Sequence, residues 1–418
     1  MSYVGALGGA SPRDDVESSP ARQASLRSHN LGVVARTIFA SEAPISRAGV
    51  AALTGLTRST VSRLTEELLA ARLITELALP DDRRRGRPAV PLAPAVGSIA
   101  GMGLEVNVDY VAGRVVDLAG TVVAESLVAG NFEDSDPGEV LPLLGALGRR
   151  LLAEAAAAGL TMAGTCLALP GLVDTAAGRL LLAPNLGWRD LAPADHLGPA
   201  VLPGNTSLHV ANEADLAGFA QSMARPGCPA GEDTFLYLSG GIGVGSAVVE
   251  RGRVAGGQRG WAGELGHVTI EPDGPDCHCG SRGCLERYAG IAAIAAAAGL
   301  PSDTTATELA AAAERDAGAR AAVDRAAWAL GIALAGAVNL IDVASVALGT
   351  GYVPLFPLLE PGITEQLERR VISASFAPVS VRPANATIAA ASTGGALRAL
   401  ETVLDAPAAW IEAGAATG

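Results

Sequence analysis

Hydrophobic residues recur at helical spacing in three segments near the N-terminus. Residues 31–40 and 46–56 each predict an amphipathic helix, and residues 57–74 predict a longer one. Ser46 is the expected N-cap of the second helix, and Gly55 lies in the turn before the third helix, which we expect to begin at Thr57. This order is typical of a helix-turn-helix, although a plain three-helix bundle would show the same periodicity.

From residue 98 onward the pattern changes to the alternation that is typical of strands. Residues 98–128 and 234–254 each predict strands joined in hairpins, with a helix at 140–159 and another strand at 163–171 between them. A long Ala-rich helical stretch from Tyr288 to about Ile341 precedes a further strand at 344–348. Two similar halves of this kind indicate an α/β body of two lobes, with the cleft between them as the default ligand site.

Composition changes this picture mainly at the N-terminal end. All 30 basic residues are Arg, and 43 acidic residues give the chain a net charge of −13. This charge disfavours binding of the whole molecule to nucleic acid or to an anionic membrane. Residues 22–90, however, hold eleven Arg against six acidic residues. Any basic function is therefore expected to be local to this segment.

Arginine also gathers in the turn that follows the predicted helix-turn-helix. After a strand-like segment at 73–79, four Arg crowd a Gly/Pro turn that must be exposed, because burying four unpaired cations would cost too much free energy. A wing hairpin in a minor groove explains this cluster, whereas pairing with Asp81 and Asp82 would make a merely solvated turn. The residues expected to bind DNA are Arg58, Ser59, Thr60, Ser62, Arg63, Arg83, Arg84, Arg85 and Arg87.

The sequence gives no sign of a membrane or secretory segment. Residues 1–20 lack the apolar core of a signal peptide, and we expect residues 1–24 to be a disordered lead-in. The apolar run 326–341 is shorter than the roughly 18 residues of a membrane helix, so we expect it to be a buried helix. Five cysteines, three of them clustered, suit a reducing cytoplasm better than a disulfide framework. We therefore expect a cytoplasmic protein.

Three of the five cysteines lie close together between residues 277 and 284. This clustering indicates a metal site, and Gly280 and Gly283 supply the turns that a metal-binding knuckle needs. The alternative is a set of buried free thiols or a disulfide between Cys277 and Cys279. Cys166 lies within an apolar strand and is expected to be a core residue.

Five motifs in the body of the chain resemble those of the ROK family. They are GELGH at 263–267, CHCGSRGCLE at 277–286, PNLGW at 184–188, NEAD at 212–215 and GGIGVG at 240–245. The family contains sugar kinases and, where a winged helix is fused to the kinase-like domain, sugar-responsive transcriptional repressors. The resemblance implies an α/β fold: an N-terminal winged helix-turn-helix at 25–95, followed at 96–418 by a two-lobed actin-like ATPase (ribonuclease H-like) ROK domain that binds sugar.

The resemblance also implies a structural zinc ion. It assigns the ligands to His267, Cys277, Cys279 and Cys284, which form a full tetrahedral set and leave no position open for water. His278 is the competing nitrogen donor, but a Cys-His-Cys tripeptide would be strained in placing three adjacent groups around one ion. We expect the metal to hold a sugar pocket in shape rather than to take part in chemistry.

The same resemblance places a sugar pocket beside the knuckle. The metal does not need Glu264 or Glu286, which would accept hydrogen bonds from sugar hydroxyls, and His267 would touch the sugar through its ring. Asn185 could equally be a turn residue, and Trp188 is expected to pack between the lobes rather than to cap the pocket. The expected sugar-binding residues are Asn185, Asn212, Glu213, Glu264, His267 and Glu286.

The kinase machinery departs from the family's pattern in three places. Glu213 stands where the kinases carry an Asp as general base, and its extra methylene displaces the carboxylate. In the first phosphate loop, Asn107 replaces a glycine that lets phosphate approach. Asp109 puts an anion where a hydroxyl belongs, which would repel each unit charge of a phosphate by roughly 4 kcal/mol. Gly240 stands at the position of a Thr in the second loop.

The expected function is therefore that of a regulator without catalytic residues. We expect a sugar-responsive repressor of carbohydrate-utilisation genes, which a sugar ligand releases from double-stranded operator DNA and which acts as a homodimer or homotetramer. One alternative is a bifunctional regulator that keeps ATP-dependent sugar kinase activity. Another is a purely DNA-binding or scaffolding protein with a vestigial pocket. A phosphorylated sugar is disfavoured, since the matched sugar motifs contain no arginine apart from Arg282 and Arg287.

Overall fold

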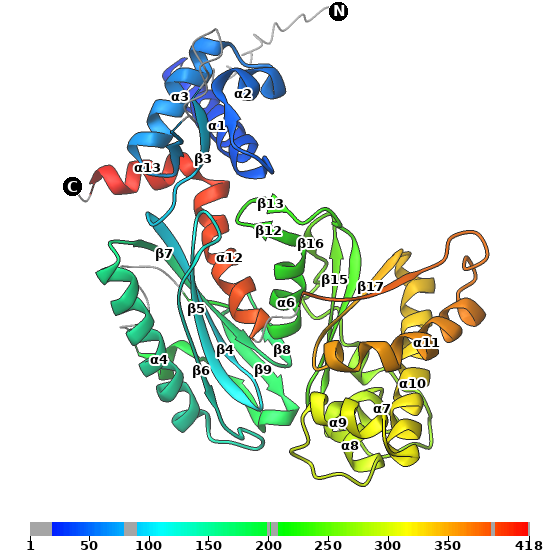
Figure 1. Cartoon of the computed structure of the whole chain (residues 1–418). Helices are drawn as coiled ribbons and strands as arrows, with labels where there is room; N and C mark the ends of the chain where they lie inside the picture. Colours follow the sequence, from blue (N-terminus) through cyan, green and yellow to red (C-terminus); the bar gives the residue numbers. More distant parts are fainter. Residues whose placement is uncertain (1–18, 79–89, 199–200, 202–207, 386–388, 417–418) are drawn as a thin grey trace, which may run out of the picture.

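The structure of the chain is a computed structural model, which describes residues 19–78, 90–198, 201, 208–385 and 389–416 (Figure 1). Its elements form an N-terminal unit of helices with a small sheet, followed by two larger α/β halves. The N-terminal unit lies at one end of the molecule, and the helices α6 (Glu213–Ser222) and α12 (Ala390–Asp405) lie between the two halves (Figure 1).

The N-terminal unit combines three helices with a three-stranded antiparallel sheet of order β1-β3-β2. The three helices confirm those that the sequence predicts, and the first begins inside the segment 1–24, for which we expected no structure. Arg83, Arg84, Arg85 and Arg87 lie outside the described residues, in the segment that joins β2 to β3. The elements are α1 (Ser19–Ala40), β1 (Ile45–Ser46), α2 (Arg47–Thr54), α3 (Arg58–Ala70), β2 (Ile74–Glu76) and β3 (Pro91–Pro94).

The boundary between α2 and α3 is fixed by caps that the sequence predicts. Ser46 Oγ accepts a hydrogen bond from Gly49 N (3.1 Å), and Thr57 Oγ1 accepts one from Thr60 N (3.2 Å). Gly55 ends α2 with φ 71°, in the left-handed region that residues with a Cβ adopt only at a cost. Each side-chain cap contributes about 1 kcal/mol to helix stability.

The core of the N-terminal unit includes residues from the far end of the chain. Leu31 and Ile38 of α1 belong to one buried apolar cluster with Leu400 and Val403 of α12. Helix α13 (Pro407–Ala416) follows α12 and packs against α1 (Figure 1). The predicted domain boundary between residues 95 and 96 thus separates α1 from two helices that help to form its core.

The first α/β half is built on a mixed sheet of order β11-β7-β4-β5-β6. β4 runs parallel to β7 and antiparallel to β5, with α4 and α12 packed on opposite faces. Trp188 is 2% exposed and belongs to the core of this half rather than to a contact between the halves. The elements are β4 (Ile99–Val106), β5 (Tyr110–Asp117), β6 (Val122–Ala129), α4 (Pro137–Ala157), β7 (Thr161–Leu169), β8 (Leu172–Asp174), β9 (Arg179–Ala183), η1 (Pro184–Leu186), β10 (Trp188–Leu191), α5 (Ala194–Leu197) and β11 (His209–Asn212).

The second half is likewise built on a mixed sheet, of order β16-β15-β14-β17-β18. Antiparallel pairing of β14 with β15 and parallel pairing of β14 with β17 mirror the pairing in the first half. Besides α6, the elements are β12 (Met223–Arg225), β13 (Cys228–Pro229), β14 (Phe235–Gly240), β15 (Val244–Glu250), β16 (Arg253–Val254), η3 (Leu265–His267), α7 (Glu286–Ala289), α8 (Ile291–Ala297), α9 (Ala306–Ala313), α10 (Ala317–Ile341), β17 (Ser345–Thr350), α11 (Tyr352–Arg370) and β18 (Ser380–Pro383).

The Ala-rich stretch expected from Tyr288 to Ile341 is divided among α7, α8, α9 and α10. The breaks have local causes: Gly299 has φ 71°, and Thr305 forms a capping box with Glu308 at the start of α9. α10 is long and apolar enough to cross a membrane by length and composition, but 61% of its most apolar window is buried in the second half. This burial agrees with the buried helix expected at 326–341.

Candidate functional site

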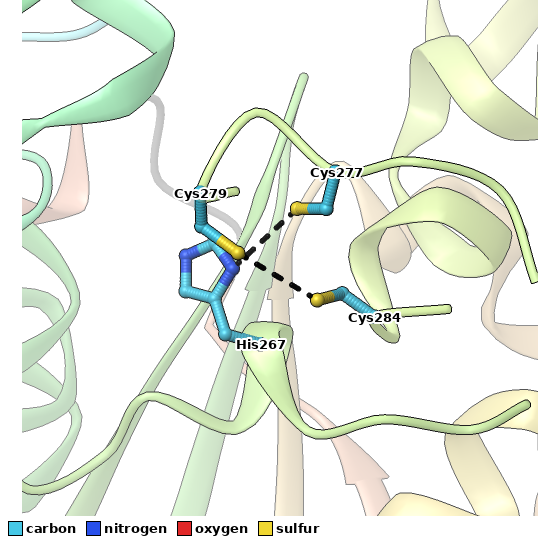
Figure 2. Close-up of side chains that lie close together, drawn as sticks. All are labelled: His267, Cys277, Cys279 and Cys284. Atoms are coloured by element: carbon cyan, nitrogen blue, oxygen red, sulfur yellow. Dashed lines mark hydrogen bonds between the residues drawn. The ribbon is translucent and has the colours of Figure 1, made fainter. Parts of the chain in front are cut away.

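Four predicted metal ligands come together in the second half (Figure 2). His267 ends the short helix η3, and the three cysteines lie in the loop that leads to α7. Cys279 Sγ lies 3.7 Å from Cys284 Sγ, Cys277 Sγ lies 3.8 Å from His267 Nδ1, and the four donor atoms all lie within 4.8 Å of one another. We call these four residues the knuckle.

The knuckle fits a tetrahedral metal ion. With metal–sulfur bonds of about 2.3 Å, donors at the corners of a tetrahedron lie about 3.8 Å apart, which matches the two distances above. All five cysteines of the chain are free thiols, so the alternative of a disulfide between Cys277 and Cys279 is not adopted. One nitrogen and three sulfurs can therefore hold a metal such as zinc.

His278, the competing nitrogen donor, is not among the four clustered donors. Its Nδ1 lies 3.4 Å from Asn185 Oδ1 in η1 of the first half. Asn185 also approaches Glu286, because a Cβ on Gly243 would lie 2.8 Å from Asn185 Nδ2 and 2.9 Å from Glu286 Oε2. The loop between β14 and β15 therefore passes close to two predicted sugar-binding side chains, one from each half, and a larger residue than Gly243 would displace them.

The two predicted carboxylates lie against the knuckle. Glu264 Oε2 lies 4.0 Å from His267 Nε2, the ring nitrogen that does not face the cysteines. Glu286 is 7% exposed, and its Oε1 accepts a hydrogen bond from the Cys277 thiol (2.9 Å). The structure thus joins the knuckle to both carboxylates through direct contacts.

Asn212 has a role that the sequence reading did not assign to it. It is the N-cap of α6: its Oδ1 accepts hydrogen bonds from Ala214 N (2.7 Å) and Asp215 N (3.2 Å), and its Nδ2 donates to Gly171 O (2.9 Å). Both ends of the amide are therefore engaged in holding α6 against the turn after β7. This geometry aims the first turn of α6, which includes Glu213, into the site.

Asn107, which the sequence analysis expects to block phosphate, contacts Glu213. It lies in the turn between β4 and β5, and its Nδ2 donates to Glu213 Oε2 (3.1 Å) across 106 residues of sequence. The sequence reading assigned Asn107 only a blocking role. In the structure the side chain also holds the carboxylate of Glu213.

The charges of Asp215, Glu264 and Glu286 act on one another in sequence, and Glu213 lies in the same first turn of α6 as Asp215. We call these four carboxylates the acidic site. Burial raises the pKa of Glu213 to about 8, with a further contribution from the charge of Glu105, and burial beside Glu264 raises the pKa of Asp215 to about 7. Burial also raises the pKa of Glu264. The sequence analysis did not predict Asp215 as a site residue, although the motif NEAD places it two residues after Glu213. Negative charge at the acidic site disfavours anionic ligands.

The raised pKa of Glu213 predicts a pH-dependent stability. The folded chain keeps a proton that the unfolded chain releases between pH 4.5 and about 8, so stability is lost as the pH rises through this window. Glu213→Gln removes this loss. It is expected to raise the free energy of unfolding, relative to the unmodified chain, by on the order of 2–4 kcal/mol at about pH 9 and by much less at about pH 5. Urea unfolding at the two pH values measures this difference, and Glu314→Gln on the surface is the control. An equal effect at both pH values would contradict the assignment.

A surface groove on the outer side of the second half contains none of these residues. It is lined by Asp324, Trp328, Gly362, Glu365, Gln366, Arg369 and Arg370 from α10 and α11. The predicted site residues therefore lie outside this groove.

Comparisons with known proteins agree with this geometry. A model of the ROK family matches residues 102–401. The xylose repressor of Bacillus subtilis (strain 168) is 26% identical over 332 residues, which are 79% of this chain and 84% of the repressor. A glucokinase of Halalkalibacterium halodurans is 30% identical over 269 residues, 60% of this chain and 79% of the glucokinase.

The solved structures extend the likeness to nearly the whole chain. The crystal structure of a ROK family transcriptional regulator, described as a homolog of the E. coli MLC protein, superposes with a TM-score of 0.75 at 25% identity and covers 93% of this chain and 99% of that chain. The two α/β halves are therefore the actin-like kinase fold that this family uses. Since the family model matches well over half of its residues, the chain belongs to the ROK family.

Proposed function

We propose that this protein is a sugar-responsive, DNA-binding transcriptional repressor in which sugar binding at the acidic site releases operator DNA. One observation carries the proposal: a single chain combines a capped three-helix unit with a separate site lined by carboxylates, in which Asn107 donates a hydrogen bond to Glu213. Its relatives include the xylose repressor and the MLC homologue, which are regulators by name.

The N-terminal unit is proposed to be a winged helix-turn-helix spanning residues 25–95. Thr57 caps the N-terminus of α3, and Arg58, Ser59 and Arg63 at that end are exposed, as direct contact with phosphates and base edges requires. Thr60 and Ser62 on the same turns are half-buried. Antiparallel β2 and β3 would form the wing. Arg83, Arg84, Arg85 and Arg87, in the sequence between these strands, are its proposed DNA contacts.

The acidic site is proposed to bind the hydroxyl groups of an unphosphorylated sugar. Ionised carboxylates accept hydrogen bonds from hydroxyls, and protonated Glu213 can also donate one at neutral pH. The proposed contacts are Glu213, Glu264, Glu286, His267 through Nε2, and Asn185, with Asn212 acting by holding α6. A phosphate group would meet several carboxylates at this place.

The knuckle is proposed to hold a structural zinc ion. His267, Cys277, Cys279 and Cys284 fill all four tetrahedral positions, so no position is left for substrate or water. The metal would fix the loop that carries Glu286 and the ring of His267. Its role is to keep the acidic site in shape.

Kinase activity is proposed to be lost. Asn107 fills the approach of phosphate, Glu213 is held by Asn107 rather than free to abstract a proton, and Gly240 packs against the ring of Tyr352. The second candidate function, a regulator that also phosphorylates sugar, is favoured by the likeness to a glucokinase. We further propose that the regulator is cytoplasmic. It would act as a homodimer or homotetramer, because two winged helix-turn-helix units related by symmetry suit a palindromic operator.

A screen and a titration test the proposed function. Thermal shift with d-xylose, d-glucose, N-acetyl-d-glucosamine and their phosphates should identify an unphosphorylated sugar that raises the melting temperature. Fluorescence anisotropy with a duplex selected by the protein from a random pool should then show weaker DNA binding when that sugar is added. A scaffold with a vestigial pocket would bind the duplex but respond to none of the sugars.

Glu264→Ala is expected to weaken sugar binding by about tenfold or more while leaving operator affinity without sugar unchanged. The reason is the loss of a charged hydrogen-bond acceptor that would face the sugar, worth roughly 1.5–3 kcal/mol. Isothermal titration calorimetry measures the sugar affinity. In a coupled assay, ATP turnover that Glu213→Ala abolishes would instead establish the bifunctional kinase.

A further inference from the structure

Helix α12 connects the surroundings of the acidic site to the N-terminal unit, which is the proposed DNA-binding unit. Its 16 residues span about 24 Å. The first turn, at Ser392, lies beside β4, whereas Leu400, Val403 and Leu404 at the other end lie in the core of the N-terminal unit. Figure 1 shows α12 running from between the two α/β halves to that unit. A shift at one end of α12 therefore reaches the other.

One buried carboxylate holds the first turn of α12. Glu105 on β4 is 2% exposed, and its two oxygens have different partners. Oε2 accepts a hydrogen bond from Ser392 N (2.7 Å), and Oε1 accepts one from Tyr110 OH (2.7 Å). A carboxylate at a helix N-terminus also interacts favourably with the helix dipole. Glu105 thus fixes α12 to the end of β4, just before the turn between β4 and β5.

The same turn binds the first residue of α6. Asn107, two residues after Glu105, donates to Glu213 Oε2 (3.1 Å). The hairpin of β4 and β5 therefore contacts the N-termini of both central helices, α12 through Glu105 of β4 and α6 through Asn107 of the turn. If Glu213 moved when sugar binds, its hydrogen bond with Asn107 would displace this turn.

Backbone contacts leave α12 little freedom to absorb such a change. A Cβ on Gly103 would lie 1.8 Å from Ser392 O, and a Cβ on Gly394 would lie 1.9 Å from Leu216 O of α6. Gly103 and Gly394 let α12 touch β4 and α6 directly, without side chains between them. Closely packed interiors transmit displacements rather than damp them.

The strands that follow α6 also contact the N-terminal unit. Arg225 of β12, three residues beyond α6, donates to Phe39 O (2.8 Å) and to Ser41 O at the end of α1, and the Cys228 thiol of β13 faces Ala40 O at 3.6 Å. Both central helices are therefore linked to α1, α12 by direct packing and α6 through β12 and β13.

From this arrangement we infer that Glu105 is a positioning residue, which couples sugar binding at the acidic site to the DNA-binding unit by holding the N-terminus of α12. The inference rests on the proposed function and adds its route of regulation. Glu105 is not proposed to touch the sugar or DNA. By linkage, loss of this coupling removes the effect of sugar on DNA affinity and the equal effect of DNA on sugar affinity.

The test compares Glu105→Leu with Glu105→Gln in the full chain. The glutamine keeps an acceptor for Ser392 N and a polar partner for Tyr110 OH, whereas leucine keeps neither. Sugar affinity is measured by calorimetry with whichever of d-xylose, d-glucose and N-acetyl-d-glucosamine gives the largest thermal shift. DNA affinity is measured by anisotropy on the selected duplex, with and without that sugar.

Glu105→Leu is expected to keep both single affinities within about threefold, while the sugar-induced fall in DNA affinity drops from about tenfold or more to less than about twofold. Glu105→Gln should restore most of the response. Hydrogen exchange should show that sugar changes the protection of α1 in the unmodified chain and in Glu105→Gln, but not in Glu105→Leu.

A second pair of variants covers the case in which Glu105→Leu does not fold. Ser392→Pro removes the donated N–H within the first helical turn, where proline is tolerated, and Ser392→Ala keeps it. Ser392→Pro should lose the sugar response and Ser392→Ala should keep it. The same sugar response in Ser392→Pro or Glu105→Leu as in the unmodified chain overturns the inference. If the unmodified chain binds the duplex and no sugar alters that binding, the proposed function itself fails.

Discussion

Replacing Cys284 with serine is expected to abolish metal binding and sugar binding together and to destabilise the fold. Cys284 is fully buried and lies 3.7 Å from Cys279 Sγ, so its loss opens the knuckle that holds the loop leading to Glu286. Loss of a structural metal is expected to lower the free energy of unfolding by about 3 kcal/mol or more. Elemental analysis, urea unfolding and calorimetry with sugar measure the three effects.

The matched control is Cys166→Ala, which removes a buried thiol from the first half. Cys166 lies in β7 among apolar neighbours and far along the chain from the knuckle. This variant should lose some stability through the small cavity it creates and should retain one metal ion per chain and full sugar affinity. If Cys284→Ser retained the metal and bound sugar normally, the knuckle would not support the acidic site.

Replacing Arg83, Arg84, Arg85 and Arg87 together with alanine is expected to weaken operator binding by about 100-fold or more near physiological salt. Each phosphate contact contributes about 0.9 to the slope of log affinity against log salt. Losing four contacts should therefore reduce that slope by about 3 to 4. Anisotropy titrations at several salt concentrations measure both quantities.

A control with the same change of net charge separates wing contacts from general electrostatics. Arg149, Arg189, Arg253 and Arg315 are exposed on the α/β body, and their replacement with alanine should leave the salt slope unchanged. Equal effects in the two quadruple variants would reject a wing that contacts DNA. Sugar affinity should be unaffected in both.

The knuckle and the caps could be predicted from sequence because their signals are local. Cys277, Cys279 and Cys284 are separated by glycine turns that bring donors together over a few residues, and Ser46 and Thr57 directly precede the helices they cap. Periodicity likewise identified the hairpins of both halves, α4, β7 and β17, but it did not predict α6, α11 or α12. The length of the Ala-rich helices was misjudged, since alanine favours a helix everywhere and only the caps divide it.

The polar contacts that join distant segments had no signal in the sequence. Glu105 meets Ser392 across 287 residues and Asn107 meets Glu213 across 106, and such pairs depend on how the sheets and central helices pack. Asn212 is a different case. An asparagine directly before an acidic first turn is typical of an N-cap, but the resemblance to a sugar-binding motif led to the prediction of a sugar contact instead.

The packing of α13 against α1 makes these two helices depend on each other, although they are far apart in the sequence. Ala408 is buried in the same cluster as Ile38, and Trp410 and Ile411 cover it. A frameshift confined to the codons after Asp405 would leave every residue of the acidic site unchanged. It would still remove the apolar side chains of α13 that pack against α1. We expect such an allele to derepress its targets rather than to make them uninducible. A chimaera that takes only the first 95 residues of a relative would fail for the same reason, and a functional transplant must exchange both ends.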